Sequence, residues 1–115
     1  MPKVLDFDKY ALSNTGPVAV GGAISVPVHL VTGSDYTLGD TDYFVEVTSE
    51  ALAPSGTVEL TIPSASNTLR GRVYLILNSK LDSSVAIDGG MDMVLPPGSA
   101  TRLLCTGERW VVIPG

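Results

Sequence analysis

Apolar and polar residues alternate along several short stretches of this chain, with the period of two that is typical of β-strands with one buried face. The clearest stretch is residues 57–62, in which Val58, Leu60 and Ile62 share one side and polar residues share the other. Pro63 follows directly and ends the strand, because proline has no backbone N–H to donate. The pattern predicts a strand with one face in a core and one face in water.

Two other stretches, residues 71–77 and 109–113, are apolar on both sides. This pattern is typical of strands that are covered on both faces. One side must then contact either a second sheet of the same chain or another subunit, and the sequence leaves both positions open. The side that would supply a trimer interface in the second case carries Tyr74, Ile76, Trp110 and Val112.

Turns rich in glycine and proline separate the remaining apolar stretches, and no interval between them predicts a substantial helix. We therefore predict an all-β fold, a small β-sandwich or barrel of about 8 short antiparallel strands. The additional strands are expected near residues 25–31, 43–48, 84–87, 91–95 and 100–105.

The first part of the chain does not share this alternation. Phe7 and Tyr10 stand there among charged residues, two of which are Lys3 and Lys9. We predict an extended N-terminal arm over residues 1–17 and one β domain over residues 18–115, since 115 residues are enough for a single core but not for two.

The composition changes this picture in two ways. Hydrophobic residues make up 44% of the chain and charged residues 17%, which is more apolar surface than a small isolated domain needs, so some of it is expected to face another subunit. The formal net charge is -5 and the seven Lys and Arg are scattered, so no basic stripe indicates nucleic acid as a partner.

No stretch of about 18 apolar residues indicates a membrane span, and the N-terminus has no apolar core of a secretion signal.

Side chains able to do chemistry are few, and we expect neither an enzyme nor a cofactor. His29 is the only histidine and lies opposite Val26, Val28 and Leu30, which predicts a solvent or interface position. The lone Cys105 is expected to be a buried structural thiol, which fits synthesis in a reducing cytoplasm.

Three acids crowd around a glycine in one predicted loop, where their oxygen atoms could hold a calcium ion. The spacing lacks the dense alternating acids of a known calcium loop, so the sequence favours no metal here but leaves a bound ion open. The three residues are Asp35, Asp40 and Asp42.

The order of segments from about residue 35 to residue 113 resembles a β-rich module of tailed-phage capsid decoration (cement), head-fibre and tail-fibre proteins. A closing turn in which a glycine precedes a tryptophan by three positions, Gly107 and Trp110, is the most distinctive piece. The segments that carry the likeness are residues 35–38, 41–45, 57–65, 71–78, 86–90, 95–99 and 103–113.

This resemblance implies a structural protein of the virion, a capsid decoration protein that stabilises the outer capsid surface as a homotrimer and has the major capsid protein as its partner. The arm would make the capsid contacts, with Phe7 and Tyr10 as anchors and Lys3 and Lys9 beside them. The alternative is a receptor- or carbohydrate-binding tip of a tail fibre. In that case Tyr36, Tyr43 or Trp110 would stack on sugar.

Overall fold

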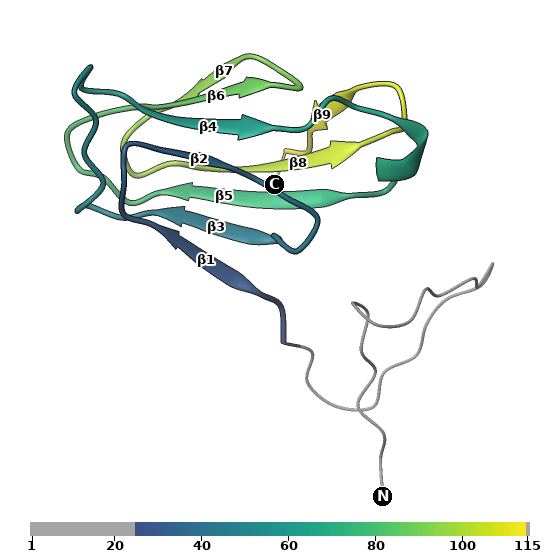
Figure 1. Ribbon diagram of the computed structural model, residues 1–115, viewed down its shortest axis with the longest axis horizontal. Coiled ribbons are helices and arrows are strands. Elements are labelled where there is room, and N and C mark those ends of the chain that lie inside the picture. Colours follow the sequence, from purple (N-terminus) through teal and green to yellow (C-terminus); the bar gives the residue numbers. More distant parts are fainter. Residues whose placement is uncertain (1–24, 115) are drawn as a thin grey trace, which may run out of the picture.

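Nine short strands form two sheets in the computed structural model, which describes residues 25–114 (Figure 1). The five-stranded sheet has the order β1 (Val28–Val31), β3 (Phe44–Val47), β5 (Val73–Asn78), β8 (Ala100–Cys105) and β9 (Trp110–Val112). The four-stranded sheet has the order β2 (Asp35–Thr37), β4 (Val58–Ile62), β6 (Val85–Gly89) and β7 (Met93–Leu95). The helical segment in this part of the chain is a single 3-10 turn, η1 (Asn67–Leu69).

The prediction of an all-β chain is confirmed, and each of the eight predicted strands is present. Their ends differ from the predicted ends by at most a few residues. The additional strand is β2, which occupies part of the acidic stretch that the sequence predicted to be a loop. It is only three residues long, so its alternation is too short to be recognised in the sequence.

The chain passes from one sheet to the other after each of its first five strands, so that β1, β3 and β5 belong to one sheet and β2, β4 and β6 to the other. Strands of one sheet are therefore joined by long crossovers, and they run parallel. The prediction of antiparallel strands is wrong for these four pairs. It holds for β5 with β8, β6 with β7 and β8 with β9. The alternation of side chains has the same period in both arrangements, so the sequence did not distinguish them.

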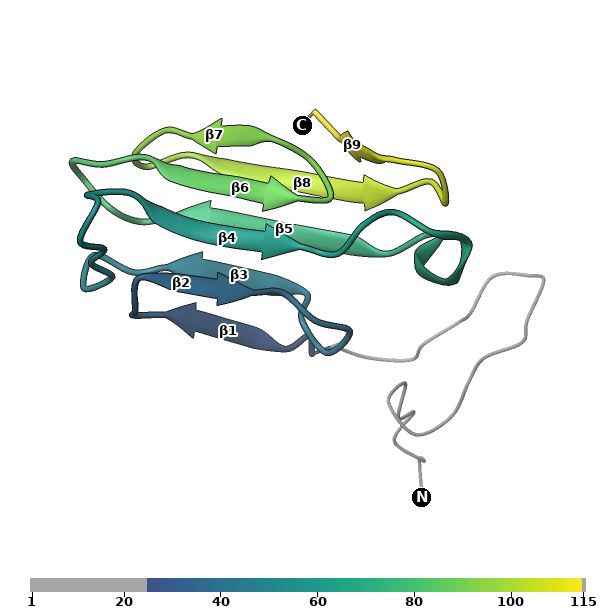
Figure 2. The same ribbon diagram turned by 45° about the horizontal axis from the view of Figure 1, so that its top comes forward.

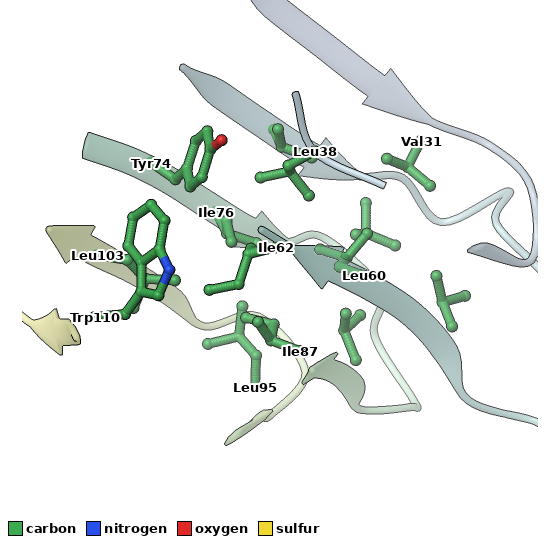
Figure 3. Packing of buried hydrophobic residues seen from close by; sticks show 14 of the residues in the cluster. Val31, Leu38, Leu60, Ile62, Tyr74, Ile76, Ile87, Leu95, Leu103 and Trp110 are labelled. Carbon is green, nitrogen blue, oxygen red and sulfur yellow. The ribbon is translucent and has the colours of Figure 1, made fainter. Parts of the chain in front are cut away.

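One cluster of buried hydrophobic side chains draws on both sheets (Figure 3). Leu60 and Ile87 enter it from the four-stranded sheet, and Ile76 and Leu103 enter it from the five-stranded sheet. Burial of each such side chain stabilises the fold by about 1.5–3 kcal/mol. The alternating residues of β4 therefore face this core, as their pattern predicted.

Trp110 closes one end of the core. Its ring stacks on that of Tyr74 with 5.2 Å between centroids, and its Nε1 donates a hydrogen bond of 2.7 Å to the carbonyl oxygen of Pro63. β9 in one sheet is thereby tied to the end of β4 in the other. Figure 3 shows the rings of Trp110 and Tyr74 next to each other.

Asn78 performs the same task at the opposite end of β5. Its side-chain amide donates to the carbonyl oxygens of Ser83, Leu95 and Pro96 at 3.0, 3.1 and 3.2 Å, and its Oδ1 accepts from the backbone N–H of Lys80. One fully buried side chain thus holds the connection from β5 to β6 and the turn that follows β7.

The predicted arm, residues 1–17, lies outside the described residues, and so do Lys3, Phe7, Lys9 and Tyr10.

Candidate functional site

The outer face of the five-stranded sheet is apolar, although it lies away from the core. Along β5, Tyr74 and Ile76 are buried on the inner side, whereas Leu75 and Leu77 are half-buried on the outer side. In the edge strand β1, Val28 and Leu30 also point outward and are 60% and 54% exposed. Apolar side chains thus continue to the rim of the sheet.

The register of the strands places these side chains in rows that cross the sheet. Val28 lies beside Phe44, and Phe44 lies beside Leu75. A second row carries Leu30 and Leu77, one on each side of Glu46. We call this surface the apolar face. Its hydrophobic members are Val28, Leu30, Phe44, Val73, Leu75, Leu77, Leu104 and Val111.

The outer face of the four-stranded sheet has the opposite character. Asp35 lies beside Glu59 in the register, and Thr37 lies beside Thr61, which in turn lies beside Asp88. Like charges directly opposite each other repel, and this arrangement is tolerable where water screens them. The two outer faces therefore differ. The four-stranded sheet has the polar pattern of a solvated surface, apart from Ala86 and the 63% exposed Val94 near its β7 edge, and the five-stranded sheet has the pattern of a surface that is covered.

Two charged side chains lie on the apolar face. Glu46 stands in the row of Leu30 and Leu77, and its Oε2 accepts a hydrogen bond of 2.7 Å from Ser79. Arg102 stands beside Leu75 and is exposed. A shallow hollow of about 220 Å³ adjoins Arg102 on this side. It is lined by Leu75, Ala100, Thr101, Arg102, Val112, Ile113 and Pro114.

A cluster of polar side chains lies near the start of β3. Both carboxylate oxygens of Asp42 accept from the Tyr36 hydroxyl, at 3.0 and 2.9 Å, and one also accepts from the backbone N–H of Gly39 at 2.8 Å. Arg72 and Tyr74 donate to the carbonyl oxygen of Gly39 at 2.9 and 3.0 Å. The cluster fixes the loop between β2 and β3 against β5.

The electrostatics of this cluster keep its two phenols neutral. Burial, together with the hydrogen bond to the Asp42 carboxylate, raises the pKa of Tyr36 from 10.0 to about 12. Burial also raises the pKa of Tyr74. Both hydroxyls therefore remain hydrogen-bond donors at neutral pH. Their acceptors are groups of the chain itself, which indicates a structural clamp.

The three acids that could have held calcium do not form a metal site. Asp42 turns inward to Tyr36 and Gly39, while Asp35 and Asp40 are exposed. Within residues 25–114 no group of three or more His, Cys, Asp or Glu side chains lies close enough to hold a metal ion.

His29 occupies a different position from the one predicted. It faces inward from β1, is half-buried, and stacks on Tyr36 with 4.0 Å between ring centroids. The prediction assumed that the apolar side of β1 faces the core, whereas Val28 and Leu30 are the outward residues. Cys105 is a buried free thiol whose Sγ lies 3.8 Å from the carbonyl oxygen of Ser66.

The four residues considered for a trimer interface do not lie together on one outer surface. Tyr74, Ile76 and Trp110 are buried in the chain's own core. They therefore contact the second sheet of the same chain, which was one of the two possibilities that the sequence left open. Val112 is 49% exposed at the edge of the five-stranded sheet. The burial of Trp110 and the stacking of His29 on Tyr36 also leave neither aromatic ring as an open platform for a sugar.

Sequence reasoning missed the residues of the apolar face. The signal was present in residues 71–77, which are apolar on both sides, but the pattern did not say which side the chain covers itself. In β1 the apolar side is the exposed one, and a strand of four residues gives no independent indication of this.

Comparison with protein families, curated proteins and solved structures finds no match for this chain. In the part of the chain that the structure describes, no helix has the length and apolar character needed to cross a membrane.

Proposed function

We propose that this protein is a non-enzymatic structural protein of a phage virion, a capsid decoration protein that binds the outer capsid surface as a trimer and stabilises it. The observation that carries the proposal is the apolar face. Contiguous apolar surface of this kind marks a protein interface, because a monomer gains nothing by exposing it to water. The order of segments that resembles decoration and fibre proteins supports the same function.

The proposal includes a finer description of the fold: the two sheets form a β-sandwich, and residues 1–17 form an extended arm. The shared core of the two sheets supports the sandwich. In a trimer the apolar faces would contact one another, and the acidic outer faces of the four-stranded sheets would remain in water.

The proposed mechanism of capsid binding is multivalent. Each copy contributes one arm, with Phe7 and Tyr10 as anchors and Lys3 and Lys9 beside them. Three weak contacts that belong to one rigid trimer bind at high effective concentration, so their combined affinity exceeds that of one arm by a large factor. The protein needs no chemistry for this function, only adhesion.

Co-sedimentation of the purified protein with expanded capsids that lack it tests the function. We expect saturable binding, with a copy number set by the threefold positions of the capsid surface. Absence of binding, together with localisation of the protein to the tail tip, would instead establish the fibre-tip alternative.

Deletion of residues 2–12 tests the arm separately. The truncated protein is expected to keep its trimeric mass in sedimentation but to lose most of its capsid binding. Capsid binding equal to that of the full chain would rule out the arm as the contact.

A further inference from the structure

The two edges of the five-stranded sheet are open within residues 25–114, and the hydrogen bonds show which residues face outward from them. The carbonyl oxygens of Pro27 and Val31 accept from the backbone N–H groups of Phe44 and Thr48. Successive residues of a strand direct their backbone groups to opposite edges. The N–H and C=O groups of Val28 and Leu30 therefore face the open edge of β1.

The same reasoning applies to β9 at the other edge. The carbonyl oxygen of Arg109 accepts from the N–H of Thr106, and the N–H of Ile113 donates to the carbonyl oxygen of Arg102. The backbone groups of Trp110 and Val112 therefore face outward. Figure 2 shows β1 and β9 at opposite ends of the molecule.

β1 lacks the features that protect an exposed edge from pairing. Native sheets protect their edges with charged residues, proline or bulges. In the four-stranded sheet, the edge strand β2 carries Asp35, and β7 lies between Asp92 and Pro96. The stretch 25–34 around β1 contains no Asp, Glu, Lys or Arg, and the side chains of Val28 and Leu30 are apolar and exposed. Pro27 precedes β1, but its carbonyl oxygen accepts from Phe44 of β3, so this proline lies on the paired side and does not block the open edge.

We propose that the β1 edge of one copy packs beside the β9 edge of the next copy, head to tail, and that three copies close into a triangular ring with one such joint at each corner. The inference rests on the proposed trimer and specifies how its subunits join. β1 runs parallel to β3 and β5, and β9 runs in the same direction, since it is antiparallel to β8 and β8 is antiparallel to β5. A ring whose axis follows the strands thus joins parallel edges, with the apolar faces turned toward the axis.

The distribution of charge favours head-to-tail contact over contact between like edges. Residues 25–57 contain no Lys or Arg, whereas residues 58–114 contain five acidic and five basic side chains. Two β1 edges brought together would place two acidic halves side by side. The acids of residues 25–57 are Asp35, Asp40, Asp42, Glu46 and Glu50.

The two charges of the apolar face also fit this arrangement. Glu46 lies on β3, the second strand from the β1 edge, and Arg102 lies on β8, the second strand from the β9 edge. Across a joint between β9 of one copy and β1 of the next, Arg102 and Glu46 approach from the two sides. Each charge would then find a partner of opposite sign in the interface.

The width of the sheet fits three copies. Strands are spaced by about 4.8 Å, so a five-stranded sheet occupies about 24 Å of a ring, and the centre of a triangle with this side lies about 7 Å from each sheet. Facing sheets pack with about 5 Å between each sheet and the midplane, so the side chains of three sheets can fill the centre. Four sheets would have their centre about 12 Å away and leave a channel.

Paired cysteine substitutions test the joint. We would make Val28→Cys, Val111→Cys and the double variant, since both side chains lie on the apolar face, and treat each with a bis-maleimide whose span is about 10 Å, which tolerates a register error of two residues. Positions 28 and 111 lie on the two edge strands, which are about 19 Å apart across one five-stranded sheet, so one chain cannot be bridged internally. The wild-type protein, whose Cys105 is buried, is the control.

The double variant is expected to yield covalent trimers on a denaturing gel, and each single variant is expected to yield none. Covalent dimers of Val28→Cys alone would show pairing of like edges and overturn the proposal. A double variant that stays uncrosslinked, although the wild-type protein sediments as a trimer, would overturn the joint and leave the trimer intact. A wild-type protein that sediments as a monomer would overturn the proposed trimer itself.

Charge exchange provides a second measurement. Arg102→Glu is expected to raise the dissociation constant of the trimer by on the order of tenfold or more, and the combination Glu46→Arg with Arg102→Glu is expected to restore most of the affinity. Glu59→Arg, on the opposite outer face, is the matched control and should leave the constant unchanged. No recovery in the double exchange would contradict the pairing of these two residues.

Discussion

Single polar side chains hold the irregular segments of this protein in place. The carboxylate of Asp42 accepts hydrogen bonds from the Tyr36 hydroxyl and from the backbone N–H of Gly39. The side-chain amide of Asn78 donates hydrogen bonds to three carbonyl oxygens. Buried polar groups of this kind contribute little net stability when paired but cost about 1–3 kcal/mol when a partner is lost. They therefore specify one conformation of each loop.

The raised pKa of Tyr36 predicts a loss of stability in alkali. In the folded chain the hydroxyl keeps its proton up to about pH 12, whereas its ordinary pKa is 10.0, so the folded state binds more protons between these values. The free energy of unfolding should fall as the pH rises through this window and be fully retained below it. Urea titrations at pH 8 and pH 11 measure the effect.

Tyr36→Phe is the control for this effect, because it keeps the ring that stacks on His29 and removes the ionisable group. Its free energy of unfolding should fall less between the two pH values than that of the wild-type protein. An equal fall in both proteins would assign the alkaline loss to other groups.

Prediction from the sequence was least successful at the scale of single residues. The inward position of Val58, Leu60 and Ile62 followed from their alternation, because Pro63 and polar neighbours marked both the strand and its wet side. For β1 the rule that the apolar side faces the core gave the wrong orientation, and His29 was misplaced with it. The choice between core and interface depends on what covers each face, and a sequence pattern does not contain this information.

The junction between the two sheets at Trp110 depends on a close approach of the backbone. A Cβ at Gly90 would meet the carbonyl oxygen of Pro63, and it would lie 2.7 Å from Nε1 and 2.8 Å from Cδ1 of Trp110. The hydrogen bond between Trp110 and Pro63, which joins β9 to the end of β4, therefore requires a residue without a Cβ at position 90. A turn that looks like ordinary hairpin chemistry thus also shapes the core.

Gly90→Ala is expected to destabilise the protein by about 1–3 kcal/mol, because the backbone and the indole must separate or shift. The tryptophan fluorescence of the folded protein should change as well. Gly33→Ala is the matched control, since a Cβ there meets nothing within 4 Å, and its free energy of unfolding should stay within about 0.5 kcal/mol of the wild-type value. A Gly90→Ala protein of wild-type stability would show that the junction adapts.

The strands themselves were the most predictable elements. Each of the eight expected strands exists, because alternation or a β-branched and aromatic run marked it and a glycine or proline turn ended it. The direction of pairing was not predictable in the same way. Whether β3 follows β1 by a hairpin or by a crossover depends on where the three residues of β2 pair, and such a short strand leaves little trace in the sequence.

At the scale of the whole molecule, the unequal character of the two outer faces is the feature on which the proposed function rests. One face follows the rule for a solvated sheet, and the other violates it over several strands. The high hydrophobic content predicted surplus apolar surface, but only the register shows that this surface is contiguous.

Leu77→Lys tests this feature, since it places a charge in the middle of the apolar face without touching the core. The variant is expected to sediment as a monomer, because burying a lysine without a partner of opposite charge in the interface opposes association. Its thermal unfolding midpoint should stay close to that of a dissociated wild-type chain. Thr37→Lys, on the outer face of the four-stranded sheet, should not change the sedimentation coefficient. A trimeric Leu77→Lys protein would exclude the apolar face from the interface.

The passage of the chain from sheet to sheet also determines when the protein can fold during its synthesis. Val28 pairs with Phe44, and Phe44 pairs with Leu75, so these contacts are distant in the sequence, and such contacts form slowly. Among the strands of residues 25–114 that pair with each other, only β6 with β7 and β8 with β9 are joined by short turns, and both hairpins lie in the last part of the chain. The central strand β5 stays unpaired on one side until β8 has left the ribosome, so we expect the sheets to close after translation is nearly complete, starting from the carboxyl-terminal hairpins.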